Sequence, residues 1–166
     1  MVRVAHIPIA SARAGFTLIE LIVVVAIITI LASGLMPLVE LASQRTKEQE
    51  LQVALREIRT AIDSYKQAVE DGRVARKADE TGYPPALEIL ATGVPNEKDP
   101  EKKKIYFMRH IPRDPFFVGA AVPGEKTWGL RSYESSPDDP RDGKDVYDIY
   151  SLSTKTGLNG VPYKKW

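Results

Sequence analysis

The 166-residue chain contains no cysteine. This absence excludes a disulfide framework, a zinc site built on thiolates and a cysteine nucleophile. It leaves the redox compartment open, because a protein without cysteine is indifferent to that compartment. Histidine is scarce as well: only His6 and His110 are present, so little imidazole is available for acid–base catalysis.

Net charge is also nearly absent. The chain has 23 Lys and Arg against 22 Asp and Glu, which gives a formal net charge of +1. A balance this even offers no global field that would favour nucleic acid or acidic substrates as partners. The length fits one compact domain plus an appendage rather than two full domains.

The motifs of common enzyme classes are missing. No glycine-rich phosphate loop follows a predicted strand. Ser132, Ser135 and Ser136 lie in predicted strand or turn contexts without a nucleophile elbow, and no nucleophile motif accompanies His110. The sequence therefore predicts a protein that is not an enzyme.

The chain does have a long hydrophobic run near its N-terminus. Leu21–Val39 is 19 residues without a charge, between Glu20 and Glu40. As a helix it would span about 28 Å, close to the hydrocarbon thickness of a bilayer. Residues 1–19 contain Arg3 and Arg13 and no acidic residue. The positive-inside rule then predicts a single pass with the N-terminus in the cytoplasm and the polar body in the periplasm.

Two other interpretations of this run are open. A secretory signal peptide also joins a basic start to an apolar stretch, but its hydrophobic region is about 7–15 residues and ends in an Ala-x-Ala-like cleavage site. The run here is longer, and helical sequence follows it. The other alternative is an unprocessed single-pass anchor for a periplasmic binding domain. Glu20 is the unusual feature of this run. A carboxylate at the start of a membrane helix is costly unless it is paired, or unless it lies among the headgroups, where it would cost little.

The segment around the start of the run reads RAGFTLIEL, from Arg13 to Leu21. It resembles the type III signal of prepilin-like proteins in the type IV pilin family. The resemblance implies that a prepilin peptidase cuts between Gly15 and Phe16, and that Phe16 becomes the N-methylated first residue. It also implies that Glu20 pairs with the terminal amine of Phe16 in a neighbouring subunit. An unpaired carboxylate in an apolar filament core is penalised, so this pairing would set the register between subunits.

Beyond Glu40 the pattern becomes that of an amphipathic helix, with apolar residues at spacings of three and four and charges on the other face. This helix is expected from about Leu38 to Asp71 and to end at Gly72. Joined to the membrane run it gives a rod of about 80 Å. The residues of the predicted buried stripe are Leu51, Ala54, Leu55, Ile58, Ile62, Tyr65 and Val69.

Gly34 and Pro37 are predicted to break this rod in its membrane part. Proline removes one backbone hydrogen bond and clashes with the preceding turn, so a kink or local melting is expected. Such a position is either tolerated in a membrane helix or, as the family resemblance implies, lets subunits stretch on assembly.

From Gly72 onward the composition shifts to proline, glycine and charge, which predicts a globular head. The segment Tyr83–Leu90 is expected to form a turn and a short helix. Two segments, Trp128–Glu134 and Val146–Leu152, are predicted as antiparallel strands, and a third strand is predicted in Val161–Trp166.

The predicted fold class is α+β, with a long N-terminal helix packed on a small antiparallel sheet, as in pilins. We expect four segments: a cleaved leader at 1–15, a transmembrane and polymerisation helix at 16–39, the amphipathic half of the helix at 40–71 and a periplasmic head at 72–166.

The head motifs narrow the resemblance to the major pseudopilin of type II secretion. They are Tyr83-Pro84, Ile111 to Phe116, Trp128-Gly129 and Tyr147 to Leu152, with 117–127 as an apparent insertion. The resemblance implies a structural subunit that polymerises with its own copies and works with minor pseudopilins, a prepilin peptidase and an inner-membrane assembly platform to drive protein export. A type IV pilin that forms a surface fibre for adhesion, motility or DNA uptake is the alternative. Because many such pilins carry a disulfide loop, the lack of cysteine favours the pseudopilin.

Calcium is the one cofactor that the resemblance raises, because major pseudopilins carry an acidic loop after Tyr-Ser-Leu. Here that loop, Ser153–Gly160, has no carboxylate, so no cofactor is expected there. A cluster of aspartates earlier in the head is a weak alternative whose spacing does not fit an EF-hand and which suits ordinary turns. Its members are Asp138, Asp139, Asp142 and Asp145.

Overall fold

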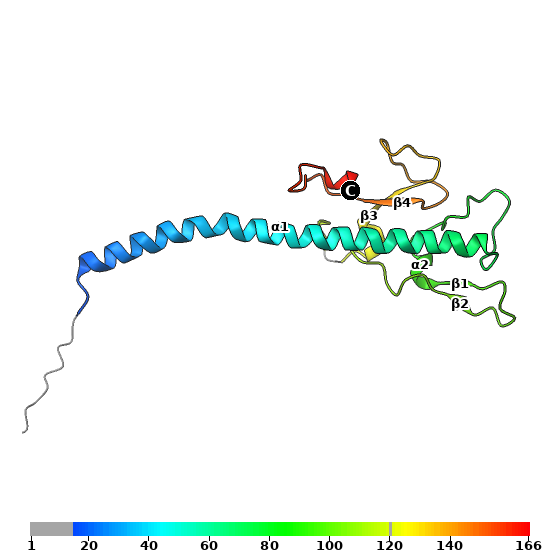
Figure 1. Ribbon diagram of the computed structural model, residues 1–166, viewed down its shortest axis with the longest axis horizontal. Coiled ribbons are helices and arrows are strands. Elements are labelled where there is room, and N and C mark those ends of the chain that lie inside the picture. Colours follow the sequence, from blue (N-terminus) through cyan, green and yellow to red (C-terminus); the bar gives the residue numbers. More distant parts are fainter. Residues whose placement is uncertain (1–14, 120) are drawn as a thin grey trace, which may run out of the picture. The chain divides into compact units, whose positions relative to one another are not determined.

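The computed structural model describes residues 15–119 and 121–166. The chain divides into two compact units between Ala42 and Ser43. The long helix α1 (Leu18–Glu70) runs through this division, and the second unit adds a head of short helices and strands (Figure 1). This confirms the predicted α+β class and the pilin-like combination of a long N-terminal helix with small antiparallel sheets.

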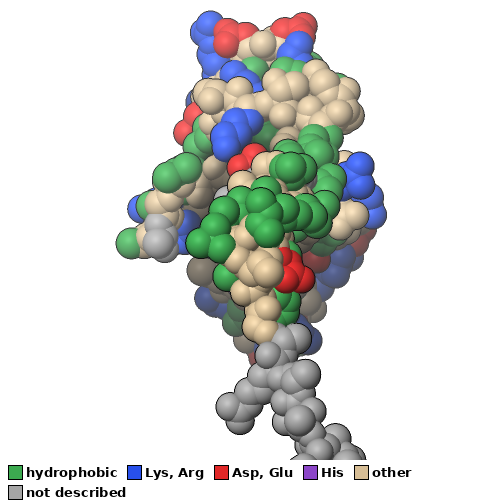
Figure 2. All heavy atoms as spheres, turned by 90° about the vertical axis from the view of Figure 1, so that its left-hand side faces the viewer, with side chains coloured by type: hydrophobic (Ala, Val, Ile, Leu, Met, Phe, Trp, Pro, Cys, Tyr) green, Lys and Arg blue, Asp and Glu red, His purple; other side chains and the backbone are tan. Residues whose placement is uncertain are grey.

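In the first unit, α1 exposes its hydrophobic side chains. From Leu18 to Val39, every side chain of α1 that the structure describes is exposed, including Ile30 at 71%. Figure 2 shows hydrophobic side chains on the surface of α1 that is turned toward the viewer. Among the described residues, α1 is the one helix long and apolar enough to cross a membrane. Its apolar surface therefore needs an environment other than water.

In this structure, α1 continues as a helix through Gly34 and Pro37. A proline inside a helix removes only its own N–H donor, and the bonds before and after it can hold the helix together. Melting at these positions on assembly stays a prediction.

In the second unit, the predicted stripe of α1 is confirmed. All seven of its residues are buried, and Ala61 and Ala68 extend it. Gly72 ends the helix as predicted, with a φ of +69°. Glycine tolerates this left-handed backbone, and the N–H groups of Arg73 and Val74 both turn back to the carbonyl of Ala68.

The central pair of strands was predicted, but with longer bounds than the structure has. Strands β3 (Trp128–Arg131) and β4 (Asp148–Ser151) are antiparallel, with Trp128 opposite Ser151. Trp128, Val146 and Ile149 from this region pack with the stripe of α1 into one core.

The rest of the head is built from very short elements. The predicted short helix is confirmed as α2 (Ile89–Thr92), and a hairpin of β1 (Val94–Pro95) and β2 (Lys104–Ile105) follows it. The sequence did not predict this hairpin. A 3-10 turn, η1 (Gly124–Thr127), leads into β3.

The prediction of a third strand in Val161–Trp166 is wrong. The segment forms a single bridge between Thr156 and Pro162 and then the 3-10 helix η2 (Tyr163–Lys165). Pro162 has no N–H to give to a ladder, and the chain turns at this point to bury Tyr163 completely.

Candidate assembly site

A reciprocal pair of hydrogen bonds forms the start of α1. The N–H of Glu20 donates to the hydroxyl of Thr17 at 3.3 Å, and the N–H of Thr17 donates to the Glu20 carboxylate at 3.5 Å. This is a capping box, in which a threonine just before the helix and a glutamate three residues later satisfy each other's backbone donors. Glu20 therefore has a structural partner within its own chain.

The predicted cleavage position is open on the chain that the structure describes. A side chain at Gly15 would meet no atom within 4 Å, and Phe16 is 77% exposed. Packing among the described residues therefore does not demand glycine at this position, and Gly15 and Phe16 are both exposed there. The leader before Gly15 lies outside the described residues.

The surface next to this bond has a simple chemistry. Between Phe16 and Val39 the chain carries hydrophobic or small side chains and a single ionisable one, Glu20. Cleavage after Gly15 would place an α-ammonium on Phe16, four residues from that carboxylate. The predicted pairing of Glu20 with a neighbouring subunit would then require the carboxylate to exchange its contact with Thr17 for that ammonium.

In the head, Glu48 of α1 is the centre of a second polar group. One of its carboxylate oxygens accepts hydrogen bonds from the N–H of Leu158 at 2.8 Å, the hydroxyl of Tyr163 at 2.8 Å and the amide of Gln44 at 3.1 Å. Burial raises the pKa of Glu48, but these hydrogen bonds and the positive charge of Arg45 outweigh burial and hold the pKa below its usual range. The loop Ser153–Gly160 is therefore held to α1 by a carboxylate of that helix.

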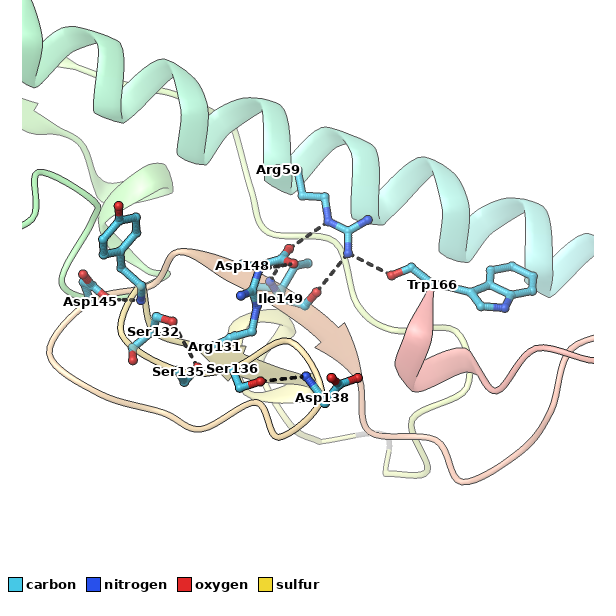
Figure 3. A network of polar contacts seen from close by, with 11 residues as sticks. Arg59, Arg131, Ser132, Ser135, Ser136, Asp138, Asp145, Asp148, Ile149 and Trp166 are labelled. Carbon is cyan, nitrogen blue, oxygen red and sulfur yellow. Dashed lines mark hydrogen bonds and ion pairs between the residues drawn. The ribbon is translucent and has the colours of Figure 1, made fainter.

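Arg59 forms a third polar group, one that joins α1 to the sheet (Figure 3). Its side chain donates to the Asp148 carboxylate at 2.8 Å, to the carbonyl of Ile149 at 3.3 Å and to that of Trp166 at 2.9 Å. The Asp148 carboxylate also accepts a hydrogen bond from the Arg131 guanidinium at 3.3 Å. These contacts fix β3, β4 and η2 to one turn of the helix.

The four aspartates considered for calcium do not converge. Asp145 is buried and accepts hydrogen bonds from the Thr81 hydroxyl and the Tyr133 N–H, whereas Asp139 pairs with Arg141 and Asp142 accepts from the N–H of Gly143. Among the residues that the structure describes, no group of three or more His, Asp or Glu is placed to hold a metal ion. Three of the four carboxylates, those of Asp139, Asp142 and Asp145, therefore have partners within the protein itself.

The residues considered for catalysis do not form a site either. His110 is exposed, and Ser132 is buried with its carbonyl accepting the Ser135 hydroxyl. In the interior, the Ser151 hydroxyl donates to the Asp114 carboxylate at 2.5 Å, and both residues are buried. The backbone N–H of Phe116 also donates to the Asp114 carboxylate. Asp114 therefore connects the 114–116 turn to Ser151 of β4.

Comparison with known proteins identifies the N-terminal region. Residues 10–36 match the family model described as the prokaryotic N-terminal methylation motif. No curated protein and no solved structure gives a match. The motif covers the predicted cleavage position, Phe16 and Glu20, and it indicates a type IV pilin-like protein that is processed by a prepilin peptidase.

None of these three polar groups was predicted. The capping box could have been found, because Thr-x-x-Glu before an apolar run is its sequence signature. The roles of Glu48 and Arg59 have no local signal, because their partners outside α1 lie 89 to 115 residues away in the chain.

Proposed function

We propose that this chain is a structural subunit of a type II secretion pseudopilus. A prepilin peptidase removes residues 1–15, Phe16 is N-methylated, and the subunit polymerises through α1 to drive protein export. The observation that carries this proposal is the exposed, charge-free surface of α1 that follows Glu20 and begins within a methylation motif. Such a surface is suited first to lipid and then to the same surface on other subunits.

The proposed partners follow from this role. Copies of the chain form the filament, and minor pseudopilins, the peptidase and an inner-membrane assembly platform act on it. The subunit waits in the bacterial inner membrane with its head in the periplasm and then enters a periplasmic filament. We assign it no catalytic activity, because its polar clusters support the fold.

The choice of pseudopilus over surface pilus rests on the head motifs and on the lack of cysteine. Electron microscopy of cells that overproduce the chain tests it directly. Short periplasmic filaments are expected, and long surface fibres would instead assign the chain to the type IV pilins.

Mass spectrometry of the membrane-extracted protein tests the processing step. The expected mass corresponds to a chain that starts at Phe16 and carries one added methyl group. An intact chain would instead support the unprocessed anchor.

The variant Glu20→Ala tests the assembly role of this carboxylate. It should be processed but fail to polymerise, with Glu40→Ala as the control. Normal filaments from Glu20→Ala would remove the assembly role of Glu20.

A further inference from the structure

In the second unit, one side of α1 borders a groove with an acidic rim, which we call the acidic groove. It has a volume of about 640 Å³, and its helical wall includes Glu50, Val53 and Glu57, with Phe117 on the opposite wall. The three helical side chains are exposed, Val53 at 53%. Within the part of the chain that the structure describes, neither carboxylate has an ion-pair partner. Arg113 also lines the groove, but its guanidinium donates to two carbonyls of its own loop.

A second surface of the same unit, which we call the basic flank, has the opposite charge. It surrounds a groove of about 530 Å³ between α1 and the segment around η2. Arg56 and Lys165 line it and are exposed, and neither has an ion-pair partner among the described residues. Val161, which is 38% exposed, and the partly exposed Trp166 add apolar surface. Asp63 lines the groove as well, but the cations outnumber it.

The acidic groove and the basic flank lie on different sides of α1. The first uses helix positions 46, 50, 53 and 57, and the second uses positions 52, 56, 59 and 63. At about 100° of rotation per residue, these two rows lie about a third of a turn apart around the helix, and the buried stripe occupies the remaining third. The same stretch of α1 therefore presents two exposed surfaces of opposite charge in different directions.

A filament built from copies of one chain needs two different surfaces on each copy. When one helical operation relates each copy to the next, a surface on one copy meets a different surface on its neighbour, and the contact continues without closing. A two-fold contact instead pairs a surface with itself and stops at a dimer. Either of the two surfaces would meet like charges if it met itself, whereas the acidic groove opposite the basic flank brings unlike charges together. The charge pattern therefore favours the open, head-to-tail contact.

We propose that the basic flank of one copy docks in the acidic groove of the next copy in the filament. In this contact Arg56 and Lys165 face Glu50 and Glu57, while Val161 meets the apolar wall at Val53. The inference rests on polymerisation in the proposed function and adds to it a contact between heads. Ion pairs at a partly exposed contact contribute more to specificity than to affinity, so this contact sets the direction and register in which the copies join.

The absence of cysteine allows this contact to be tested by cross-linking two distinguishable copies. An affinity-tagged full chain with Val53→Cys and an untagged full chain with Val161→Cys are produced in the same cells. The membrane fraction that contains the filaments is then treated with a short bismaleimide. A dimer of one tagged and one untagged chain is expected, and neither variant alone should give a dimer. Glu101→Cys, exposed beside the β1–β2 hairpin, replaces Val161→Cys as the control and should give none.

Electron microscopy of the same cells separates this inference from the proposed function. Filaments without the mixed dimer would overturn the contact between heads and leave polymerisation standing. Dimers from Val53→Cys alone or from Val161→Cys alone would overturn it in favour of a two-fold contact. A cross-linked product of another mass in place of the mixed dimer would overturn it in favour of a different protein partner. If the unaltered chain forms no filament, the proposed function fails and this contact fails with it.

Charge reversal tests whether unlike charges hold the contact. Introduced into both cysteine variants, Glu50→Lys with Glu57→Lys should remove the mixed dimer, because like charges then face each other. Arg56→Glu with Lys165→Glu should have the same effect, and all four changes together should restore the dimer. An unchanged Tm of each variant shows that the head is still folded. A mixed dimer that survives either pair of changes, or that fails to return with all four in a folded head, would overturn the proposal.

Discussion

The hydroxyl of Tyr163 donates a 2.8 Å hydrogen bond to Glu48, 115 residues earlier in the chain. Tyr163 is fully buried, and its ring stacks on Phe116 with 4.1 Å between centroids. The same carboxylate receives the backbone of Leu158. One side chain of α1 therefore fixes both the loop after β4 and the turn of η2.

The contact makes the stability of the head depend on pH. Because the folded-state pKa of Glu48 is lower than its ordinary value of 4.5, ionised Glu48 stabilises the fold above that value. The stabilisation is lost as the pH falls through the folded-state pKa. Thermal unfolding of the full chain in detergent should show a falling Tm below about pH 4.5.

Comparison with Glu48→Gln isolates this contribution. The variant should lower Tm at neutral pH and flatten the acid part of the curve. The pKa of Asp71 is also lowered, chiefly by a hydrogen bond from Gln67, but Asp71 is unchanged in the variant. Parallel acid curves for the two proteins would contradict the role of Glu48.

Chelation should have no effect on the head. The loop Ser153–Gly160 has no carboxylate, and Glu48 supplies the negative group that ties it down. Calcium chloride or EDTA is therefore expected to leave the Tm unchanged. A rise in Tm with calcium that EDTA reverses would reveal ligands other than the aspartates considered above.

Replacement of Arg59 should loosen the sheet from α1. Arg59→Met keeps the aliphatic stem and removes the three donated hydrogen bonds, so a loss of about 1–2 kcal/mol is expected for this partly exposed group. Arg56→Met, at an exposed position one turn earlier, is the matched control. Equal losses in the two variants, measured by denaturant unfolding, would rule out a special role for Arg59.

The stripe of α1 should be the most sensitive part of the head. Ile58 is fully buried, and Ile58→Ala should cost about 2–5 kcal/mol because it removes apolar contacts and leaves a cavity. Val53→Ala changes a side chain that is 53% exposed on the same helix and should cost about 0.5 kcal/mol or less. A small loss for Ile58→Ala would mean that the head repacks freely.

The parts of the fold that follow a regular local pattern in the sequence were predictable. The stripe from Leu51 to Val69 follows helical spacing, and Gly72 supplies the left-handed backbone that ends it, so both could be predicted from local sequence. The strands of the β1–β2 hairpin have two residues each, too few to show any alternation. The segment around Tyr163 looked like a strand because its apolar residues fit one, but burial of that ring decided the outcome.

In the candidate site too, some features follow from local sequence and others depend on the folded chain. Cleavage after Gly15 and the role of Glu20 were expected from a contiguous motif, and the matched methylation motif covers both. The partners of Glu48 and Arg59 are set by the path of the folded chain, and a single sequence does not contain that path. The aspartates from Asp138 to Asp145 illustrate the converse, since closeness in sequence did not bring their carboxylates together.

The long separation between Glu48 and its partners also bears on the order of folding. A loop of more than 100 residues must close before the Leu158 N–H meets this carboxylate, and such closure is slow compared with local helix formation. During synthesis, the hydrophobic run and the rest of α1 leave the ribosome long before residues 158–163 do. The head is therefore expected to complete its fold only after the membrane segment has been delivered, so that insertion comes first and maturation of the head second.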